Sequence, residues 1–288
     1  MSRQDLPEGI VIREIVDIPG MRRVESLQKE IWGFTDLDVV PMNQLKASVT
    51  AGAILLGAYD RGEMIGFVYG FVGLEDGHTI IHSHMMAVKP EYRNSQVGYR
   101  LKLAQRESAL EKGIRRMTWT FDPLQSRNAY FNFAKLGVIC DKYLVDFYGE
   151  ETSSPLHQGG TDRFLVTWRL DDPGVIEKIS QTAGAIPETD EAGIILRIEP
   201  DERPGALREI PSAPDCPWEI EIPRDLLALC ERWPEAPAVW RLATRDAFLA
   251  ALQHGYIVTG FHRRKRAGLE FGAYRMTRQT ATGAESRG

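Results

Sequence analysis

Two histidines separated by one residue, His82 and His84, are the side chains best suited by type and spacing to carry out chemistry. Imidazole has a pKa of about 6.5, so a neutral histidine can accept a proton at neutral pH. Both residues lie in a run of strand-forming residues, and side chains two apart on a strand point to the same face. The spacing therefore predicts a pair that takes up a proton directly or through water, with His84 as the first candidate.

Two other interpretations of this pair stay open. A histidine on a central strand is often a hydrogen-bonded core residue, and the same spacing suits two metal ligands. A zinc site needs at least three protein ligands, and the sequence offers no obvious third one. Metal binding is the weakest of the three interpretations, and we expect no metal.

A turn and a helix follow the histidine pair. The helix is predicted over 97–112, with Gly113 at its end. The N–H groups of a helix's first turn, together with the helix dipole, bind phosphate without needing a particular side chain. Gly98 lets the main chain approach a ligand closely, and Arg93 and Arg100 can add charge-assisted hydrogen bonds. The segment predicts a phosphate or pyrophosphate site, although many such junctions are only structural.

Apolar residues between 10 and 170 alternate between a period of two and a period of about 3.6, which is typical of a mixed α/β domain. Three successive strand-like runs near the start indicate an antiparallel meander. The predicted strands are 10–15, 53–59, 64–71, 79–88, 117–121, 138–147 and 164–170, and the predicted helices are 21–32, 43–49, 97–112 and 128–135.

Beyond residue 171 many prolines interrupt the sequence, which predicts a smaller C-terminal α/β lobe over 171–278 after a first domain over 1–170. Residues 279–288 are predicted to be a flexible tail. The lobe ends in strand, helix, strand, strand, at 218–222, 245–253, 256–262 and 269–276. This order repeats that of 117–170, so a degenerate half-repeat is a hypothesis. The basic run 262–266 is predicted to be a hairpin tip in water.

Composition excludes several classes of protein. The 35 Lys and Arg residues against 40 Asp and Glu residues leave a net charge of -5, so we expect no nucleic-acid partner. Apolar runs such as 53–56 are far shorter than the roughly 18 residues that span a bilayer, so we expect no membrane association. Three cysteines without a CxxC pair fit reduced thiols, and the start of the chain lacks the apolar segment of a secretory signal. We therefore expect a cytoplasmic protein.

The turn and helix after the histidines resemble the GNAT superfamily of N-acetyltransferases, whose motif is V-x-P-x-Y-R-G-x-G-x-G-x-x-L followed by a long helix and a glycine. A second family motif, A-x-x-F/Y-x-K-L-G-F, precedes the last strands of the family fold. It also has a counterpart in this sequence, in the right order. The matching residues are Val88, Pro90, Tyr92, Arg93, Gly98, Leu101 and Gly113 for the first motif, and Ala129, Phe133, Lys135, Leu136 and Gly137 for the second.

The resemblance covers about residues 10–170 and implies a splayed, mostly antiparallel central sheet that holds acetyl-CoA or another acyl-CoA. It implies that main-chain N–H groups near Met86 polarise the thioester carbonyl. It also implies that the histidine pair relays the substrate's proton, as in arylalkylamine-type members. The residues expected to bind the acyl-CoA are Met86, Val88, Arg93, Asn94, Ser95, Gln96, Val97, Gly98, Tyr99, Arg100 and Phe133.

Two residues depart from the family pattern. Gln96 stands where the family usually has the first glycine of the phosphate turn, which implies a looser approach of the main chain to the pyrophosphate. Phe133 stands where many members carry a tyrosine that protonates the departing thiolate. Tyr130, one helical turn earlier, is a candidate substitute, and the alternative is that it is an aromatic core residue.

The resemblance therefore implies an acyl-CoA-dependent N-acyltransferase that transfers an acetyl or longer group, such as succinyl, to a small-molecule amine or amino acid. The amine would attack directly in a ternary complex. A rival interpretation is a non-catalytic acyl-CoA-binding module whose residues Gln96 and Phe133 record lost activity. A third is a protein acetyltransferase, which needs an open groove for an extended peptide. The oligomeric state is not indicated.

Overall fold

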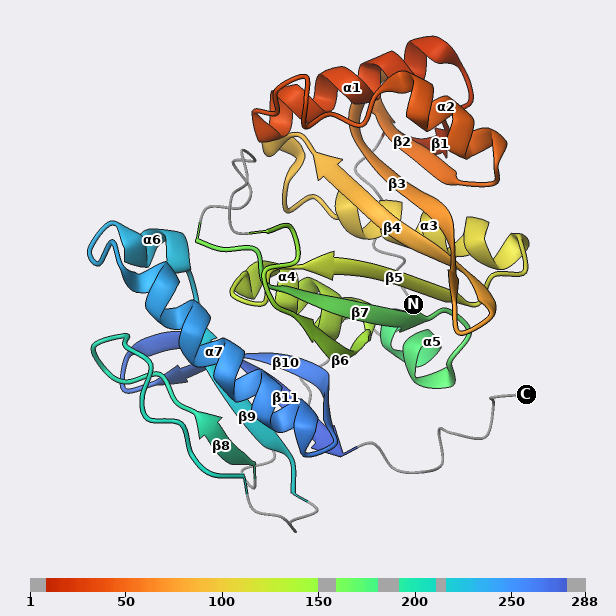
Figure 1. Ribbon diagram of the computed structural model, residues 1–288. Coiled ribbons are helices and arrows are strands. Elements are labelled where there is room, and N and C mark those ends of the chain that lie inside the picture. The colour runs from red at the N-terminus through yellow and green to blue at the C-terminus, as the bar shows by residue number, and fades with distance from the viewer. Residues whose placement is uncertain (1–8, 150–158, 181–191, 211–215, 279–288) are drawn as a thin grey trace. The chain divides into compact units, whose positions relative to one another are not determined.

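The computed structural model describes residues 9–149, 159–180, 192–210 and 216–278 (Figure 1). The described residues form two compact units, 9–119 and 120–278. The predicted domain boundary between residues 170 and 171 stays a prediction. The predicted tail, 279–288, lies outside the described residues.

The first unit is a five-strand sheet with helices on both sides. Figure 1 shows α1 and α2 on one side of the strands and α3 on the other. The strands follow one another in the order β1-β2-β3-β4-β5, and all neighbours are antiparallel except β4 and β5. Its elements are β1 (Ile10–Glu14), α1 (Ile18–Trp32), α2 (Met42–Thr50), β2 (Ile54–Asp60), β3 (Glu63–Glu75), β4 (His78–Val88), the short 3-10 helix η1 (Pro90–Tyr92), α3 (Val97–Glu111) and the start of β5 (Arg116–Phe121).

Helix α1 begins three residues before its predicted start. The Asp17 carboxylate accepts a hydrogen bond of 2.7 Å from the N–H of Gly20 and caps the helix. Proline is tolerated in the first turn, because its missing N–H would have no partner inside the helix. Pro19 and Gly20, which a sequence pattern would assign to a turn before the helix, therefore lie inside it. Met21, Val24 and Leu27 of α1 are fully buried in the core of this unit.

The second unit is a six-strand sheet in the order β7-β6-β10-β11-β9-β8. Its strands are antiparallel except for β8 and β9. Together the two units confirm the predicted mixed α/β class with mostly antiparallel pairing. The elements of the second unit are α4 (Ser126–Ala129), the π-helix η2 (Tyr130–Leu136), β6 (Ile139–Leu144), β7 (Arg163–Arg169), α5 (Pro173–Ser180), β8 (Gly193–Leu196), β9 (Trp218–Pro223), α6 (Leu226–Cys230), α7 (Ala236–Gln253), β10 (Tyr256–Arg266) and β11 (Leu269–Arg278).

The order of elements after β4 recurs after β8. In both places a parallel strand pair is followed by helix and then by an antiparallel hairpin, β6–β7 in one case and β10–β11 in the other. This order agrees with the half-repeat hypothesis. Helix α7 begins nine residues before its predicted start, because Arg241 and Thr244 on its buried face interrupt the apolar period.

The basic run 262–266 lies at the end of β10, next to the hairpin turn at 267–268, and Arg263 and Lys265 are exposed as predicted. The other two basic residues do not simply face water. Arg264 lies 2.6 Å from Glu219, and Arg266 makes two contacts of 2.7 and 2.9 Å with Glu221. Both glutamates are buried. Since side chains alternate along a strand, every second basic residue of β10 reaches these acids, which a count of charges along the sequence does not reveal.

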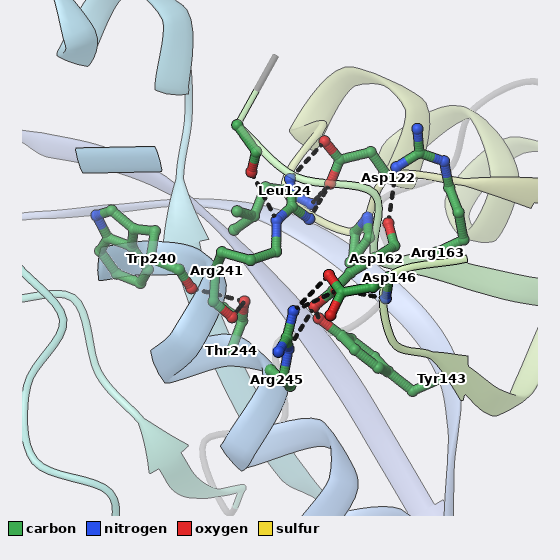
Figure 2. A network of polar contacts seen from close by, with 12 residues as sticks. Asp122, Leu124, Tyr143, Asp146, Asp162, Arg163, Trp240, Arg241, Thr244 and Arg245 are labelled. Carbon is green, nitrogen blue, oxygen red and sulfur yellow. Dashed lines mark hydrogen bonds and ion pairs between the residues drawn. The ribbon is translucent and has the colours of Figure 1, made fainter. Parts of the chain in front are cut away.

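Two arginines of α7, one helical turn apart, hold the loops of the second unit together (Figure 2). Arg241 is 5% exposed and makes a bidentate pair with Asp122 at 2.6 and 2.9 Å. Arg245 makes a second bidentate pair with Asp162 at 2.7 and 2.9 Å and also contacts Asp146. The pairs connect α7 with the loop after β5 and with the segment before β7.

We expect Asp122→Ala to lower the free energy of unfolding by about 3 kcal/mol, because it leaves the buried guanidinium of Arg241 without its partner. Urea denaturation at neutral pH measures this loss. The matched control is Asp201→Ala, which removes the exposed partner of Arg203 and is expected to change the stability by less than about 0.5 kcal/mol. Equal effects of the two substitutions would contradict the importance of the buried pair.

Candidate functional site

Strand β4 carries a β-bulge at His84. Met85 pairs with Tyr69 and Ser83 pairs with Gly70, so His84 has no opposite residue on β3. A bulge bends a strand and turns the extra side chain to a new direction. His84 is the most exposed residue between Ile80 and Val88 for this reason.

The two imidazole rings of β4 both lie against the ring of Phe71. The ring centroid of Phe71 is 5.2 Å from that of His82 and 5.8 Å from that of His84. The Nδ1 atom of His82 lies 3.0 Å from the hydroxyl oxygen of Thr118 on β5. The structure therefore brings the predicted pair together at a partly exposed aromatic surface, and it also gives His82 a hydrogen-bond partner.

Both histidines are neutral at physiological pH. The pKa of His82 is lowered to about 4, first by burial and then by the nearby charges of His84 and Lys102, while Glu75 acts in the opposite direction. His84 is more exposed, yet the surrounding protein excludes enough water to lower its pKa as well. A neutral imidazole is the form that can accept a proton. Their role as bases stays a prediction.

One edge of β4 is open within residues 9–119. Strand β4 pairs with β3 as far as Val88, but its parallel pairing with β5 comprises only Ile81 with Met117 and His82 with Thr118. Main-chain N–H groups after His82 on that edge therefore have no strand partner in this unit. They include the groups near Met86 that the sequence predicts to contact a thioester.

The turn between β4 and α3 has a left-handed main chain at two positions. Asn94 has a φ of 68° and Gln96 has a φ of 66°, a region that favours glycine. Counted along the family motif, Asn94 stands at the first glycine and Gln96 at the second, so assigning Gln96 to the first glycine was wrong. The turn keeps the conformation of a glycine-rich loop although neither position is glycine. The sequence predicted that the main chain would approach a pyrophosphate less closely because of Gln96. The main-chain conformation of the turn gives no support for that prediction.

Several predicted ligand-binding side chains are used inside the turn. The hydroxyl of Ser95 donates to the carbonyl oxygen of Tyr92, and the hydroxyl of Tyr92 donates to Asp60 at 2.8 Å. The Nε of Arg93 lies 3.5 Å from the carbonyl oxygen of Val88. These bonds hold the turn in place, and contact with an acyl-CoA stays a prediction for its side chains.

The first turn of α3 packs against the end of β4. Val97 is buried, and a Cβ atom added to Gly98 would meet the side chain of Met86 at an ordinary contact distance of 3.5 Å. Packing therefore does not require glycine at this position. Close approach of a ligand remains the predicted reason for Gly98. The roles predicted for Tyr99 and Arg100 also stay predictions.

The two aromatic residues predicted from the second motif lie in the second unit. Phe133 is fully buried, and its ring contacts those of Phe164 and Tyr274, so it is a core residue there. Tyr130 is partly exposed, and the guanidinium of Arg263 on β10 lies 4.1 Å from its ring centroid. Proton donation by Tyr130 and cofactor contact by Phe133 stay predictions.

Sequence reasoning missed a buried lysine on α3, Lys102, which is 3% exposed. Its ammonium group donates to the hydroxyl of Ser83 at 2.7 Å, lies 3.4 Å from the side-chain oxygen of Gln105, and sits 3.7 Å from the ring centroid of Trp119. Burial lowers the pKa of Lys102 to about 7. A lysine in a helix is normally expected to face solvent, so the sequence gives no sign that Lys102 is buried.

The described part of the chain has neither a metal-binding cluster nor a membrane-spanning helix. These residues contain no group of three or more His, Cys, Asp or Glu side chains placed to hold a metal ion. They also contain no helix that is long and apolar enough to cross a membrane.

Residues 20–137 match the model of the acetyltransferase (GNAT) family. This segment is of the GNAT family. The match contains α1, the histidine pair, the turn and α3, and it ends at Gly137 after the second motif. It confirms the resemblance inferred from the two motifs. No curated protein matches the sequence.

Solved structures similar to this chain include several acetyltransferases. A ribosomal-protein alanine N-acetyltransferase from Escherichia coli has 13% identity and a TM-score of 0.46, and the alignment covers 57% of this chain and 96% of that enzyme. An aminoglycoside 6'-acetyltransferase type Ii has 18% identity and a TM-score of 0.45, with 56% and 98% covered. A GNAT-family acetyltransferase from Streptococcus pneumoniae has 18% identity and a TM-score of 0.43, with 55% and 97% covered.

We expect Gln96→Gly to be more stable than Gln96→Ala by about 1 kcal/mol. Both variants lose the same side-chain contacts, but only glycine adopts a left-handed main chain without steric cost. Thermal or urea unfolding of the two variants measures the difference. Equal stability, or a more stable alanine variant, would contradict the left-handed conformation at this position.

We expect Lys102→Met to flatten the pH dependence of stability. The pKa of Lys102 falls from 10.5 to about 7 on folding, so between about pH 7 and pH 10.5 the unfolded chain binds a proton that the folded protein does not. Wild-type stability therefore falls as the pH falls from 10.5 to 7, and the penalty is constant below 7. When the pH is lowered from 9.5 to 7, the free energy of unfolding of the variant should rise relative to that of wild type by on the order of 3 kcal/mol.

Urea unfolding at these two pH values tests the lysine prediction. Lys112→Met, at the exposed end of the same helix, is the matched control and should differ from wild type by the same amount at both values. If the Lys102 variant behaves like this control, the lysine is not forced to lose its proton by burial.

Proposed function

We propose that this protein is an acyl-CoA-dependent N-acyltransferase that transfers an acetyl or other acyl group to the amine of a small molecule or amino acid. The observation that carries the proposal is the turn at Asn94 and Gln96, a phosphate-binding type of loop inside a segment of the GNAT family. Its left-handed main chain leads directly into the N-terminus of α3, where helix N–H groups favour an anion. The GNAT match supports a thioester co-substrate at this place.

The acyl carrier would bind mainly through main-chain groups. The first N–H groups of α3 would donate hydrogen bonds to the diphosphate, and the edge of β4 after His82 would bind the arm that ends in the thioester. An N–H group near Met86 would polarise the thioester carbonyl. This requires no metal ion.

The chemical step would be attack by a neutral amine on the thioester carbon. An alkylamine has a pKa near 10, so it must lose a proton before or during the attack. His84 is the first candidate for the base, since it is neutral and stands out from the strand at the bulge. The C–S bond then breaks, and the thiolate takes a proton from Tyr130 or from water.

A non-catalytic acyl-CoA-binding module is the second candidate. The observation that favours it is the full burial of Phe133, which has no proton to give and stands at the position of the usual acid. Both candidates predict binding of coenzyme A, and only one predicts turnover. A small-molecule acceptor, a cytoplasmic location and the absence of a nucleic-acid partner remain predictions from the sequence.

We expect His84→Ala to reduce acyl transfer by about a hundredfold, the usual contribution of a general base. Release of free thiol from a panel of acyl-CoA donors and amines measures the rate. His78→Ala, at the exposed start of the same strand, is the matched control and should leave the rate unchanged. Calorimetry with coenzyme A establishes that each variant still binds.

Three results would overturn parts of this proposal. Binding of coenzyme A without thiol release from any donor and amine favours the binding module. Thiol release that His84→Ala leaves unchanged removes the base assignment. The absence of any heat with coenzyme A or acyl-CoA contradicts both candidates.

A further inference from the structure

The buried lysine of α3 connects the helix with the segment of β4 that carries the two histidines. Ser83, whose hydroxyl accepts the bond from Lys102, lies between His82 and His84 in the sequence. The Ser83 hydroxyl in turn donates to the side-chain oxygen of Gln105 at 2.8 Å. The histidine rings lie against Phe71, and Lys102 and Gln105 belong to α3. The short segment that carries the histidines is thus held by hydrogen bonds from one helix.

This lysine has no ion-pair partner within the described residues. The three groups around its ammonium are a hydroxyl, an amide oxygen and the face of the Trp119 indole. Burying a positive charge without a carboxylate costs free energy, and proteins seldom keep such a residue where an apolar side chain would pack as well. A functional reason for the lysine is therefore worth testing.

The charged groups around His82 come from three elements. His84 is on the same strand, Glu75 is on β3, and Lys102 is on α3, while the neighbour on β5 is the uncharged Thr118. Glu75 itself pairs with Arg116 at 3.3 Å. Lys102 and Glu75 act on a proton at His82 in opposite directions.

We propose that Lys102 is a positioning residue for the histidine pair: through its hydrogen bond to Ser83 it holds the segment that carries both imidazoles, and it places a cationic group beside that segment. The proposal rests on the proposed function, because the protonation of this pair matters where an imidazole accepts the substrate's proton. Because Lys102 is buried, the proposal gives it no contact with the acyl-CoA or with the amine.

The proposal separates Lys102 from an ordinary structural residue. A lysine that only fills space would lower stability when replaced, but it would leave the titration of a histidine on another element unchanged. If Lys102 acts through its charge, its removal must raise the pKa of His82, whereas removal of Glu75 must lower that pKa. Burial alone lowers the pKa of His84, so His84 is an internal reference in the same spectra.

The experiment is an NMR titration of the histidine side chains in the full-length protein, without substrate. We expect Lys102→Met to raise the pKa of His82 and Glu75→Gln to lower it, each with a smaller movement of His84. Lys112→Met is the matched charge control and should move neither ring. If the Lys102 variant does not fold, the Glu75 variant and the wild type still test the sign of the charge effect.

Turnover adds a second measurement. In a profile of kcat/KM against pH, the acid limb of Lys102→Met should move in the same direction as the pKa of His82. An unchanged or lower pKa of His82 in Lys102→Met, or an unchanged or higher one in Glu75→Gln, would overturn the proposal. A shifted pKa in a protein that shows no acyl transfer would leave the charge coupling intact and count against the proposed function instead.

Discussion

The unequal pairing of β4 is the constraint on which the candidate site depends. Its hydrogen bonds to β3 continue to Val88, while its parallel pairing with β5 in the first unit involves only Ile81 and His82. A strand that is held on one edge and open on the other exposes ordered N–H and C=O groups without unfolding. The bulge at His84 adds a side chain at the place where the pairing ends. The end of the pairing with β5 thus leaves main-chain N–H groups available, and the adjacent bulge provides the imidazole of His84.

The two sides of β4 carry different chemistry. On one side two neutral imidazoles and the ring of Phe71 form a partly exposed surface. On the other, Ser83 belongs to a buried network with Lys102 and Gln105. Because side chains alternate along a strand, a single short segment serves both networks. Burial of the lysine without a carboxylate partner is expected to cost stability, which is the reason to look for a role other than folding.

The second unit depends on buried ion pairs in a comparable way. Arg241 and Arg245 satisfy the carboxylates of Asp122 and Asp162 with bidentate geometry, and Tyr143 donates to Asp162 at 2.6 Å. Such pairs contribute less to net stability than to the choice of one packing, because an arrangement that leaves either charge unpaired is strongly disfavoured. They explain how a long helix from the C-terminal part of the chain is joined to the loop after β5.

The sequence by itself determined the α/β class, the position of the turn before α3 and the spacing of His82 and His84. These features are local, since the period of apolar residues and a short motif specify a strand, a turn and a helix without reference to the rest of the chain. The GNAT resemblance followed from the same local residues. It placed Gln96 at a glycine position of the turn, and the main chain there is left-handed. It did not assign a glycine position to Asn94, whose main chain is also left-handed.

Only the tertiary structure decided which charged residues are buried. Several charged residues give no local sign in the sequence that they are buried. They are Lys102, Arg241 and the two glutamates of β9, Glu219 and Glu221. The bulge at His84 depends on the register of two strands, and the burial of Phe133 depends on rings from distant segments. Their environment comes from elements far apart in the chain, because burial and pKa depend on what packs around a residue and not on its neighbours in sequence.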